Sequence, residues 1–558
     1  MDRIRAPLLI TLLVTTLAGC HLPGRFMRGY AEAEPQGMEL LSEHGAFATA
    51  PSNVRGQVRF LFDDFGSLTT DNLRRNVWPW KLVGAALVRD RHLSDGAPIN
   101  RRTLDRVFEE YGFIRPTAVA NWTGPQPRFE RPMGMLAGMA RRGFPAVEIE
   151  VANLGCATCH AGPLFGADGR PTGEVWLGLP NASIDLSAYS DGAFAALQRE
   201  LETPDSLIAT IAVLFPEVSE RELSTLRKFA SSSAREQLAF RAEEFGRLLP
   251  GGPGLSNSLG SVRFSMGALR SDSRAHQVAW TSAPDLAGTT MRRSLLIDGV
   301  LAAPASERYG AMKRSDVDAD HLDDLAAVTS LQITASQGVP PQDALERIPE
   351  MREVLDFLHT TESPPFPGTV DRALALRGAD VFETACASCH GEYSEGLSDV
   401  RLLVHPNRLT PQDRMLTDSV RWATAQHEEL SALLGEVGYL EHIEPLNGGG
   451  YIAPDLGGLW ATAPYLHNGS VPTLWHLMHA EQRPERFYVG GHMLDYELVG
   501  IAGALGHDGV YRYPKGYEPW SRSALYDTRE PGRSNAGHEF RMLTEEQKCA
   551  LLEYLKVL

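Results

Sequence analysis

The chain has 558 residues, of which 43% are hydrophobic and 22% are charged, and its formal net charge is −17. This length suits about two to four domains, and the composition is that of an ordinary globular protein. The negative charge argues against a nucleic acid as partner, because a surface that binds phosphates has to neutralise them.

A targeting segment opens the chain. Arg3 and Arg5 form a short positive region, residues 7–17 an apolar run, and Leu-Ala-Gly-Cys closes it at Cys20. The run is too short to span a membrane, so residues 1–20 are predicted to be a signal peptide. The closing residues resemble the lipobox of bacterial lipoproteins. That resemblance implies lipidation of Cys20 and a place in the periplasm or at the cell surface, anchored to the outer membrane. The alternative is a plain secretory signal.

The next elements in chain order are a linker and several helices. Residues 21–55 are rich in Gly, Pro, Ala and Glu, which predicts a linker. An extended approach is expected over 144–154. A Pro-rich stretch at 363–368 predicts a domain junction. Apolar residues at helical spacing predict helices over 72–88, 103–113, 205–249, 346–359, 370–385 and 544–558, the last with a capping box formed by Thr544 and Gln547.

Two Cys-x-x-Cys-His motifs are the strongest chemical signals. The first comprises Cys156, Cys159 and His160, and the second comprises Cys386, Cys389 and His390. Two thioethers attach a porphyrin along one edge, and the adjacent His then ligates the iron from the proximal face. A redox or zinc Cys-x-x-Cys does not require the following His. The sequence therefore predicts two covalently bound haem c groups.

The second motif has a cytochrome-like frame. Gly378 and Phe382 lie one helical turn apart before it, and this pattern resembles the N-terminal helix of class I cytochromes c. In that helix a small residue permits close crossing by the C-terminal helix. The predicted partner face in the last helix consists of Leu551, Leu552, Tyr554 and Leu555. The first motif has no such helix before it.

Residues 453–474 read APDLGGLWATAPYLHNGSVPTL. This stretch resembles a signature of the bacterial di-haem cytochrome c peroxidase superfamily, which includes MauG-type enzymes and the rubber oxygenases. The form WATAPYLHNGS is most similar to the rubber-oxygenase branch. With the two haem motifs, the resemblance covers about residues 150–558. It implies that the backbone carbonyls of Thr462 and Pro464 bind one calcium ion, which prefers oxygen ligands.

The resemblance also bears on the sixth ligand of each iron. In the peroxidases a Met beyond the signature His ligates the electron-transfer haem, but here Glu481 holds that position. The rubber-oxygenase branch uses His on both faces of its C-terminal haem. His538 is the first candidate for this ligand and His467 the second. The alternative for His538 is an ordinary loop residue, and for His467 a structural residue.

The N-terminal haem is predicted to have an open or weakly closed face. The histidines between the motifs are His276, His321 and His359, and none lies in a pattern typical of a distal ligand. Glu148, Glu150 and Asp285 are candidates for an acid or base at this site. An aromatic distal pocket of the rubber-oxygenase kind is not evident, which argues against cleavage of rubber itself. Trp280 and Trp460 are candidates for an aromatic between the haems, with packing as the alternative role.

These observations predict a mainly α fold of two c-type cytochrome domains with long loops and few short strands. The N-terminal haem domain, with helical insertions, is placed at 56–365 and the C-terminal cytochrome c domain at 366–558. The first functional hypothesis is an exported oxidoreductase. Its C-terminal haem relays electrons from or to a small redox partner, and its N-terminal haem activates peroxide or dioxygen. The second is a di-haem electron carrier with both irons six-coordinate.

Overall fold

The computed structural model describes residues 49–67, 78–142, 147–231, 251–257, 260, 262, 280–424 and 427–558. The predicted signal peptide with Cys20, most of the predicted linker, the end of the predicted helix over 205–249 and His276 lie outside the described residues. None of the described helices is long and apolar enough to cross a membrane.

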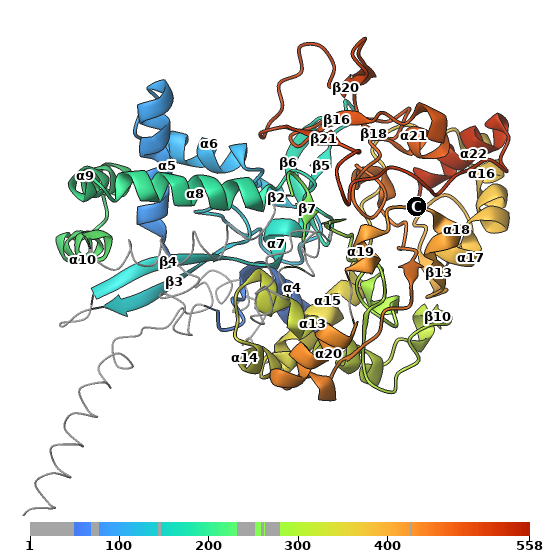
Figure 1. Ribbon diagram of the computed structural model, residues 1–558, viewed down its shortest axis with the longest axis horizontal. Helices are drawn as coiled ribbons and strands as arrows, with labels where there is room; N and C mark the ends of the chain where they lie inside the picture. Colours follow the sequence, from blue (N-terminus) through green and yellow to red (C-terminus); the bar gives the residue numbers. More distant parts are fainter. Residues whose placement is uncertain are drawn as a thin grey trace, which may run out of the picture.

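A helical lobe forms the left side of the molecule in Figure 1. Its buried side chains, among them Trp80, Phe108 and Phe215, form one apolar core. A long hairpin of β3 (Met135–Arg142) and β4 (Val147–Leu154) lies beneath it, and β4 ends just before the first haem motif. The predicted extended approach to that motif is thereby confirmed. The helices of the lobe are α5 (Trp80–Asp95), α6 (Arg101–Glu110), α8 (Leu186–Glu200), α9 (Pro204–Leu214) and α10 (Glu220–Ser231).

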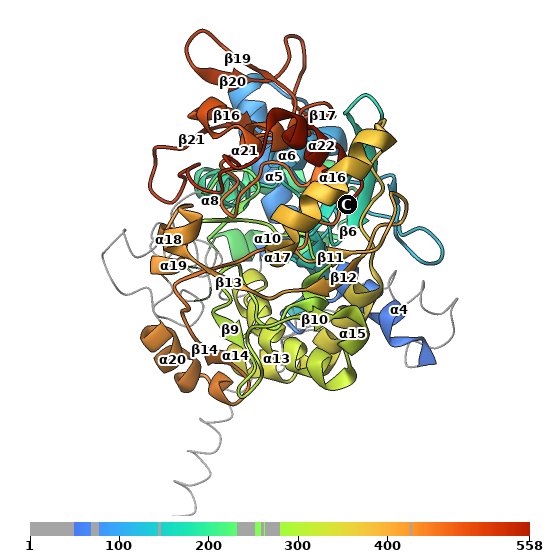
Figure 2. The same ribbon diagram turned by 90° about the vertical axis from the view of Figure 1, so that its right-hand side faces the viewer.

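A second apolar core joins segments far apart in the sequence. It contains residues of α4 (Ser52–Phe62), α13 (Ala319–Ser336) and α15 (Ile348–Thr360), together with Leu430 and Leu434 of α20 (His427–Glu436). Both ribbon views place α20 beside α13 and α14 (Pro341–Leu345) (Figures 1 and 2). A segment C-terminal to residue 366 therefore completes a core built mainly by residues before it. The domain limits at 56–365 and 366–558 remain a prediction.

The C-terminal frame is a pair of crossing helices, α16 (Arg372–Ala385) and α22 (Glu545–Leu555). A Cβ added at Gly378 would lie 2.0 Å from the carbonyl oxygen of Ala550, so only glycine permits this approach. The rings of Phe382 and Tyr554 lie 5.4 Å apart across the crossing. Both the close crossing and the capping box at the start of α22 confirm the predictions from the sequence.

The prediction of a mainly α protein made of two cytochrome domains is wrong. The chain is 41% helical and 16% strand, and the described strands form eight small sheets. Most of these strands are two to four residues long and pair distant segments, so they carry no alternating pattern that sequence analysis could detect. The pairs include β9 (Leu301–Ala302) with β14 (Glu444–Pro445), β13 (Leu409–Pro411) with β15 (Gly450–Ile452), β7 (Leu255–Ser256) with β8 (Thr281–Ser282), β17 (Leu494–Asp495) with β18 (Gly500–Ile501) and β1 (Trp78–Pro79) with β4.

Three larger sheets complete the strand inventory. In each of them at least one strand pairs with a segment that is not its neighbour in the chain. Their members are β2 (Ala118–Val119), β6 (Pro171–Leu177) and β5 (Ala161–Phe165); β10 (Met312–Lys313), β12 (Leu402–His405) and β11 (Glu392–Tyr393); and β19 (Ala504–Leu505), β20 (Val510–Arg512), β16 (Arg486–Val489) and β21 (Ala524–Asp527).

Two loops, 281–300 and 451–470, follow the same backbone course, and we call them the paired loops. Each carries Ala-Pro-Asp-Leu from its third residue, at 283–286 and 453–456, and continues into a short 3-10 helix, η4 (Thr289–Met291) or η7 (Leu459–Ala461). Each then passes through a left-handed leucine, with φ of 67° at Leu296 and 66° at Leu466. This repeat within the chain places one Pro-Asp pair beside each haem motif.

Candidate functional site

One cavity of about 1690 Å³ brings the two haem motifs together. It exceeds the roughly 300–1,000 Å³ of ordinary small-molecule sites. The end of β4 delivers the first motif on α7 (Cys156–Cys159), and α16 delivers the second on α17 (Ala387–His390). The motif residues on its wall are Cys156, Cys159, His160, Cys386, Cys389 and His390.

Each proximal histidine is oriented by one of the paired loops. The Nδ1–H of His160 donates to the carbonyl oxygen of Pro284 at 3.2 Å, and that of His390 donates to Pro454 at 3.0 Å. In each histidine, the hydrogen bond from Nδ1 fixes the tautomer and leaves Nε2 free to ligate a metal. Burial lowers the pKa of His160 to about 4 and also lowers the pKa of His390, so both imidazoles are neutral, as ligation requires.

The four motif thiols are free cysteines and not disulfides. Burial raises the pKa of Cys156 to about 12, of Cys159 to about 11 and of Cys386 to about 12. Thiols protected in this way are poor candidates for thiolate redox chemistry. They fit thioether attachment of a porphyrin, with the neutral imidazole of each motif beside them.

His538 faces His390 across the cavity. The centroids of the two imidazole rings lie 6.0 Å apart, and metal–imidazole bonds are about 2 Å long, so one metal ion fits between the rings. The Nδ1 atom of His538 is buried and has no hydrogen-bond partner. Burial, with smaller effects of His390 and Arg483, lowers the pKa of His538 to about 4. The first candidate for the sixth ligand therefore lies where a ligand of the second haem is needed.

The backbone at His538 is strained, and other residues hold it in place. Its φ is +49°, in the left-handed region, directly after Gly537 at +78°. For a residue with a Cβ this conformation costs about 1–2 kcal/mol. The His538 N–H donates to the carbonyl oxygen of Met415 at 3.0 Å, and the Arg483 guanidinium donates to the carbonyls of Gly537 at 2.8 Å and His538 at 3.2 Å. Such strain is typical of functional positions.

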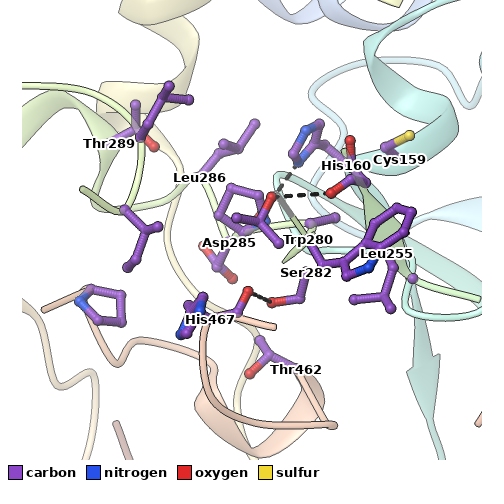
Figure 3. Close-up of a pocket in the computed structure, with 18 of the residues that line it drawn as sticks. Cys159, His160, Leu255, Trp280, Ser282, Asp285, Leu286, Thr289, Thr462 and His467 are labelled. Atoms are coloured by element: carbon purple, nitrogen blue, oxygen red, sulfur yellow. Dashed lines mark hydrogen bonds between the residues drawn. The ribbon is translucent and has the colours of Figure 1, made fainter. Parts of the chain in front are cut away.

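His467, the second ligand candidate, also lines the cavity. Its ring lies 4.6 Å from that of Tyr451, and its Nε2 is buried without a hydrogen-bond partner. Its carbonyl oxygen accepts the Ser282 N–H at 2.7 Å, which ties the paired loops together. In Figure 3, Asp285 and Ser282 lie between His160 and His467. Burial and, second, Arg421 lower the pKa of His467 to about 3.

The two described histidines between the motifs, His321 and His359, do not line the cavity. The Nε2–H of His321 donates to the carbonyl of Thr290 at 2.9 Å, and Nδ1 of His359 bonds the hydroxyl of Thr290 at 3.0 Å. Among the described histidines, those on the cavity wall are His160, His390, His467 and His538. The described part of the chain therefore supplies an imidazole opposite His390 and brings neither His321 nor His359 to His160.

Of the three candidate carboxylates, Asp285 alone lines the cavity. Burial, opposed by an N–H from Ala287 and reinforced by Asp455, raises the pKa of Asp285 to about 8, so it carries a proton at neutral pH. Glu150 forms an ion pair with Arg131, and Glu148 is exposed on β4.

The two candidate tryptophans occupy different places. Trp280 lies on the cavity wall, as Figure 3 shows, with Arg533 5.7 Å above its ring. Trp460 is 1% exposed, donates from Nε1 to the carbonyl of Pro364 at 3.0 Å and packs edge-on against Phe366. Trp460 is not among the residues that line the cavity, so its position suits packing of the Pro-rich stretch.

The calcium candidates Thr462 and Pro464 border the haem cavity and a small adjoining one. Within the described ranges no group of three or more His, Cys, Asp or Glu side chains is arranged to hold a metal ion. A calcium ion here would have to rely on backbone carbonyls, as the resemblance implies, and this site remains a prediction.

Several residues of the site were not predicted from the sequence. The carbonyls of Pro284 and Pro454 hold the proximal histidines, and the repeated Ala-Pro-Asp-Leu was a signal that could have found them. Two arginines on the cavity wall, Arg292 and Arg421, were also not predicted, and no sequence signal existed for them.

Comparison with known proteins places one family match inside this site. Residues 450–488 match the RoxA-like, cytochrome c-like family, and this segment contains Pro454 and His467. The match supports a relation to cytochrome c, a haem-binding redox role and haem c as the cofactor. It covers the C-terminal part alone, so two equivalent cytochrome domains receive no support from it.

Two curated relatives come from Sinorhizobium fredii (strain NBRC 101917 / NGR234). The uncharacterized protein y4iM is 29% identical over 221 residues, which are 36% of this chain and 49% of that protein. The uncharacterized protein y4iJ is 37% identical over 119 residues, or 19% of this chain and 18% of that protein. The chain thus spans about half the length of the first relative and less than a fifth of the second.

Proposed function

We propose that this chain is an exported di-haem c-type oxidoreductase of the peroxidase-like or oxygenase-like kind. The haem at Cys386 and Cys389 relays electrons, and the haem at Cys156 and Cys159 activates peroxide or dioxygen. One observation carries this proposal: His538 faces His390 at 6.0 Å, whereas none of the described histidines is brought opposite His160 in the same way. An iron with two protein ligands transfers electrons, and one with an open face binds an oxidant.

The residues of the chain prepare the two sites differently. The carbonyls of Pro284 and Pro454 keep both proximal imidazoles in one tautomer. Arg483 holds the strained backbone that presents His538 to the second site. Buried apolar side chains such as Leu355 and Ile333 border the common cavity. Both motifs line this cavity, and Trp280 lies on its wall, so electrons would pass between the sites across it.

The proposed location of the protein is the outer membrane. Lipidation at Cys20 would anchor it to the outer membrane, where a small redox donor or acceptor exchanges electrons with the second haem. A calcium ion on the carbonyls of Thr462 and Pro464 would stabilise the paired loops beneath both sites. The aromatic role of Trp280 between the haems belongs to the same proposal.

The test counts the haems and determines the spin state of each. The full chain is produced in cells that attach haem c, and its pyridine haemochrome spectrum should give two haems per chain. Electron paramagnetic resonance should show one high-spin and one low-spin iron, and added peroxide should change the high-spin signal. In a C156A/C159A variant the high-spin signal should vanish, and in a C386A/C389A variant the low-spin signal should vanish. If both irons are low-spin and added peroxide does not change their spectra, the result would contradict the proposal and favour the electron carrier.

A further inference from the structure

Arg421 is a buried cation on the cavity wall with unused hydrogen-bond donors. It lies on α19 (Val420–Ala423) and is 1% exposed. Its Nη1 lies 3.2 Å from Oδ2 of Asp298, which is also fully buried. Despite this ion pair, Nε, Nη1 and Nη2 all lack a hydrogen-bond partner among the described residues. A buried guanidinium normally satisfies its donors, so these indicate an acceptor that binds here.

Arg292 adds a second cation to the same group. It lines the cavity, donates from Nη2 to the carbonyl of Leu296 at 3.1 Å and leaves a buried Nε without a partner. No ion pair within 4 Å is found for it in the described part of the chain, although the more distant Asp298 acts on its charge. Burial lowers the pKa of Arg292 to about 10, which leaves it charged at neutral pH.

The acids near Arg421 do not satisfy its hydrogen-bond donors. Arg292 and Arg421 contribute two positive charges and Asp298 one negative charge. Asp418 adds a second buried carboxyl group nearby, but its oxygens accept the N–H groups of Val420 at 2.9 Å and Ser534 at 3.0 Å. Tyr451 donates its hydroxyl to the carbonyl of Asp418 at 2.7 Å, so it offers Arg421 no anion. A buried donor without an acceptor is destabilising, and a bound carboxylate would satisfy it.

We infer that Arg421 and Arg292 form a binding site for a carboxylate, and that a propionate of a covalently attached haem supplies it. The planar guanidinium matches a carboxylate with two parallel hydrogen bonds. The arginines share one cavity with both haem motifs, and haem c carries two propionates. The inference rests on the proposed two-haem function. The alternative source of the bound carboxylate is a free carboxylic acid anion that enters the cavity.

The position of the group beside the paired loops supports this choice. Arg292 and Asp298 belong to the loop 281–300, whose Pro284 carbonyl binds His160, and Arg421 pairs with Asp298. The Ile452 N–H donates to the carbonyl of Ile297 at 2.8 Å, which joins this loop to the loop 451–470 that binds His390. The cations therefore lie beside the loops that orient both proximal histidines, in the cavity that both motifs line.

The experiment measures haem content and then the reduction potential of each haem in full-length holoprotein. The variants are R421Q, R421K and R292Q, and the matched control is R106Q, because the Arg106 side chain on α6 is 77% exposed. Removing a cation leaves the propionate charge uncompensated and favours the ferric state. At a fixed poise, R421Q should lower the reduced-to-oxidised ratio of one haem about tenfold, which equals 59 mV for one electron. R421K should stay closer to the parent, and R106Q should not change the ratio.

The outcomes separate the inference from the function on which it rests. A parent protein with fewer than two haems overturns both, and this is decided before any potential is measured. Two attached haems with unchanged potentials in R421Q and R292Q overturn the inference alone. If R421Q cannot be purified with haem attached, the reduction potentials of R292Q alone decide whether the inference holds. Parent potentials that shift with added acetate at constant ionic strength would show a free carboxylate in the site and overturn the propionate source.

Discussion

At the residue scale, His538 has the most direct prediction. Replacing it by Ala should convert the haem at Cys386 and Cys389 from low spin to high spin, because the imidazole that faces His390 at 6.0 Å is lost. Absorption and paramagnetic resonance spectra of the holoprotein measure this change, and added imidazole should reverse it. H492A is the matched control, since His492 is 3% exposed but does not line the cavity. An unchanged spectrum in H538A would remove the assignment of this ligand.

His405 gives a prediction about pH. It is fully buried, donates from Nε2 to the carbonyl of Ala453 at 3.2 Å and accepts the Asn407 N–H at Nδ1 at 3.1 Å. Burial, with a smaller effect of Arg292, lowers its pKa from 6.5 to about 3. The unfolded chain therefore binds a proton that the folded chain does not, and stability falls as the pH drops from 6.5 towards 3.

The size of this effect can be measured with one variant. Between pH 7 and pH 5, His405 should lower the free energy of unfolding by about 2 kcal/mol. In H405Q, denaturant unfolding curves should show a correspondingly smaller loss over the same interval. A variant that loses as much stability as the parent would show that other buried histidines cause the acid sensitivity.

At the element scale, the crossing of α16 and α22 supports the second haem motif. In G378A the new Cβ would meet the Ala550 carbonyl oxygen at 2.0 Å, a backbone atom that cannot move aside alone. The free energy of unfolding should fall by about 1–3 kcal/mol, as for other overpacked sites. G435A on α20 is the control, because its Cβ would meet only the end of the Leu440 side chain, at 3.1 Å. Equal stability of the two variants in denaturant unfolding would contradict the tight crossing.

At the scale of the whole molecule, α20 joins a core built mainly by residues before 366. Leu434 is fully buried there, and the hydroxyls of Tyr439 and Ser330 share a hydrogen bond of 3.1 Å. L434A should lower the free energy of unfolding by about 2–5 kcal/mol. Because the core is common to both parts, the loss should appear in one transition, seen alike by circular dichroism and by the haem bands.

The matched control for this prediction is L440A. Leu440 is 45% exposed, so its truncation should change stability by less than about 0.5 kcal/mol. Two separate transitions, with L434A shifting only one of them, would show that the two parts fold independently in spite of the shared core.

The sequence by itself determined the features that are local along the chain. The two Cys-x-x-Cys-His motifs, the helices at 348–360, 372–385 and 545–555, and the role of Gly378 follow from residue type and helical spacing within a few turns. It also pointed to His538, through a resemblance and not through any local rule. These features are predictable because a covalent motif or an amphipathic helix is complete within its own segment.

The tertiary structure alone decided which distant residues meet. It paired short strands into eight small sheets and brought α20 into a core shared with α13 and α15. The same packing places His538 opposite His390. It also places Arg292 and Arg421 on the cavity wall, with Asp298 beside Arg421. No local pattern encodes such contacts, because each depends on burial and charge balance that exist only after the segments have packed together.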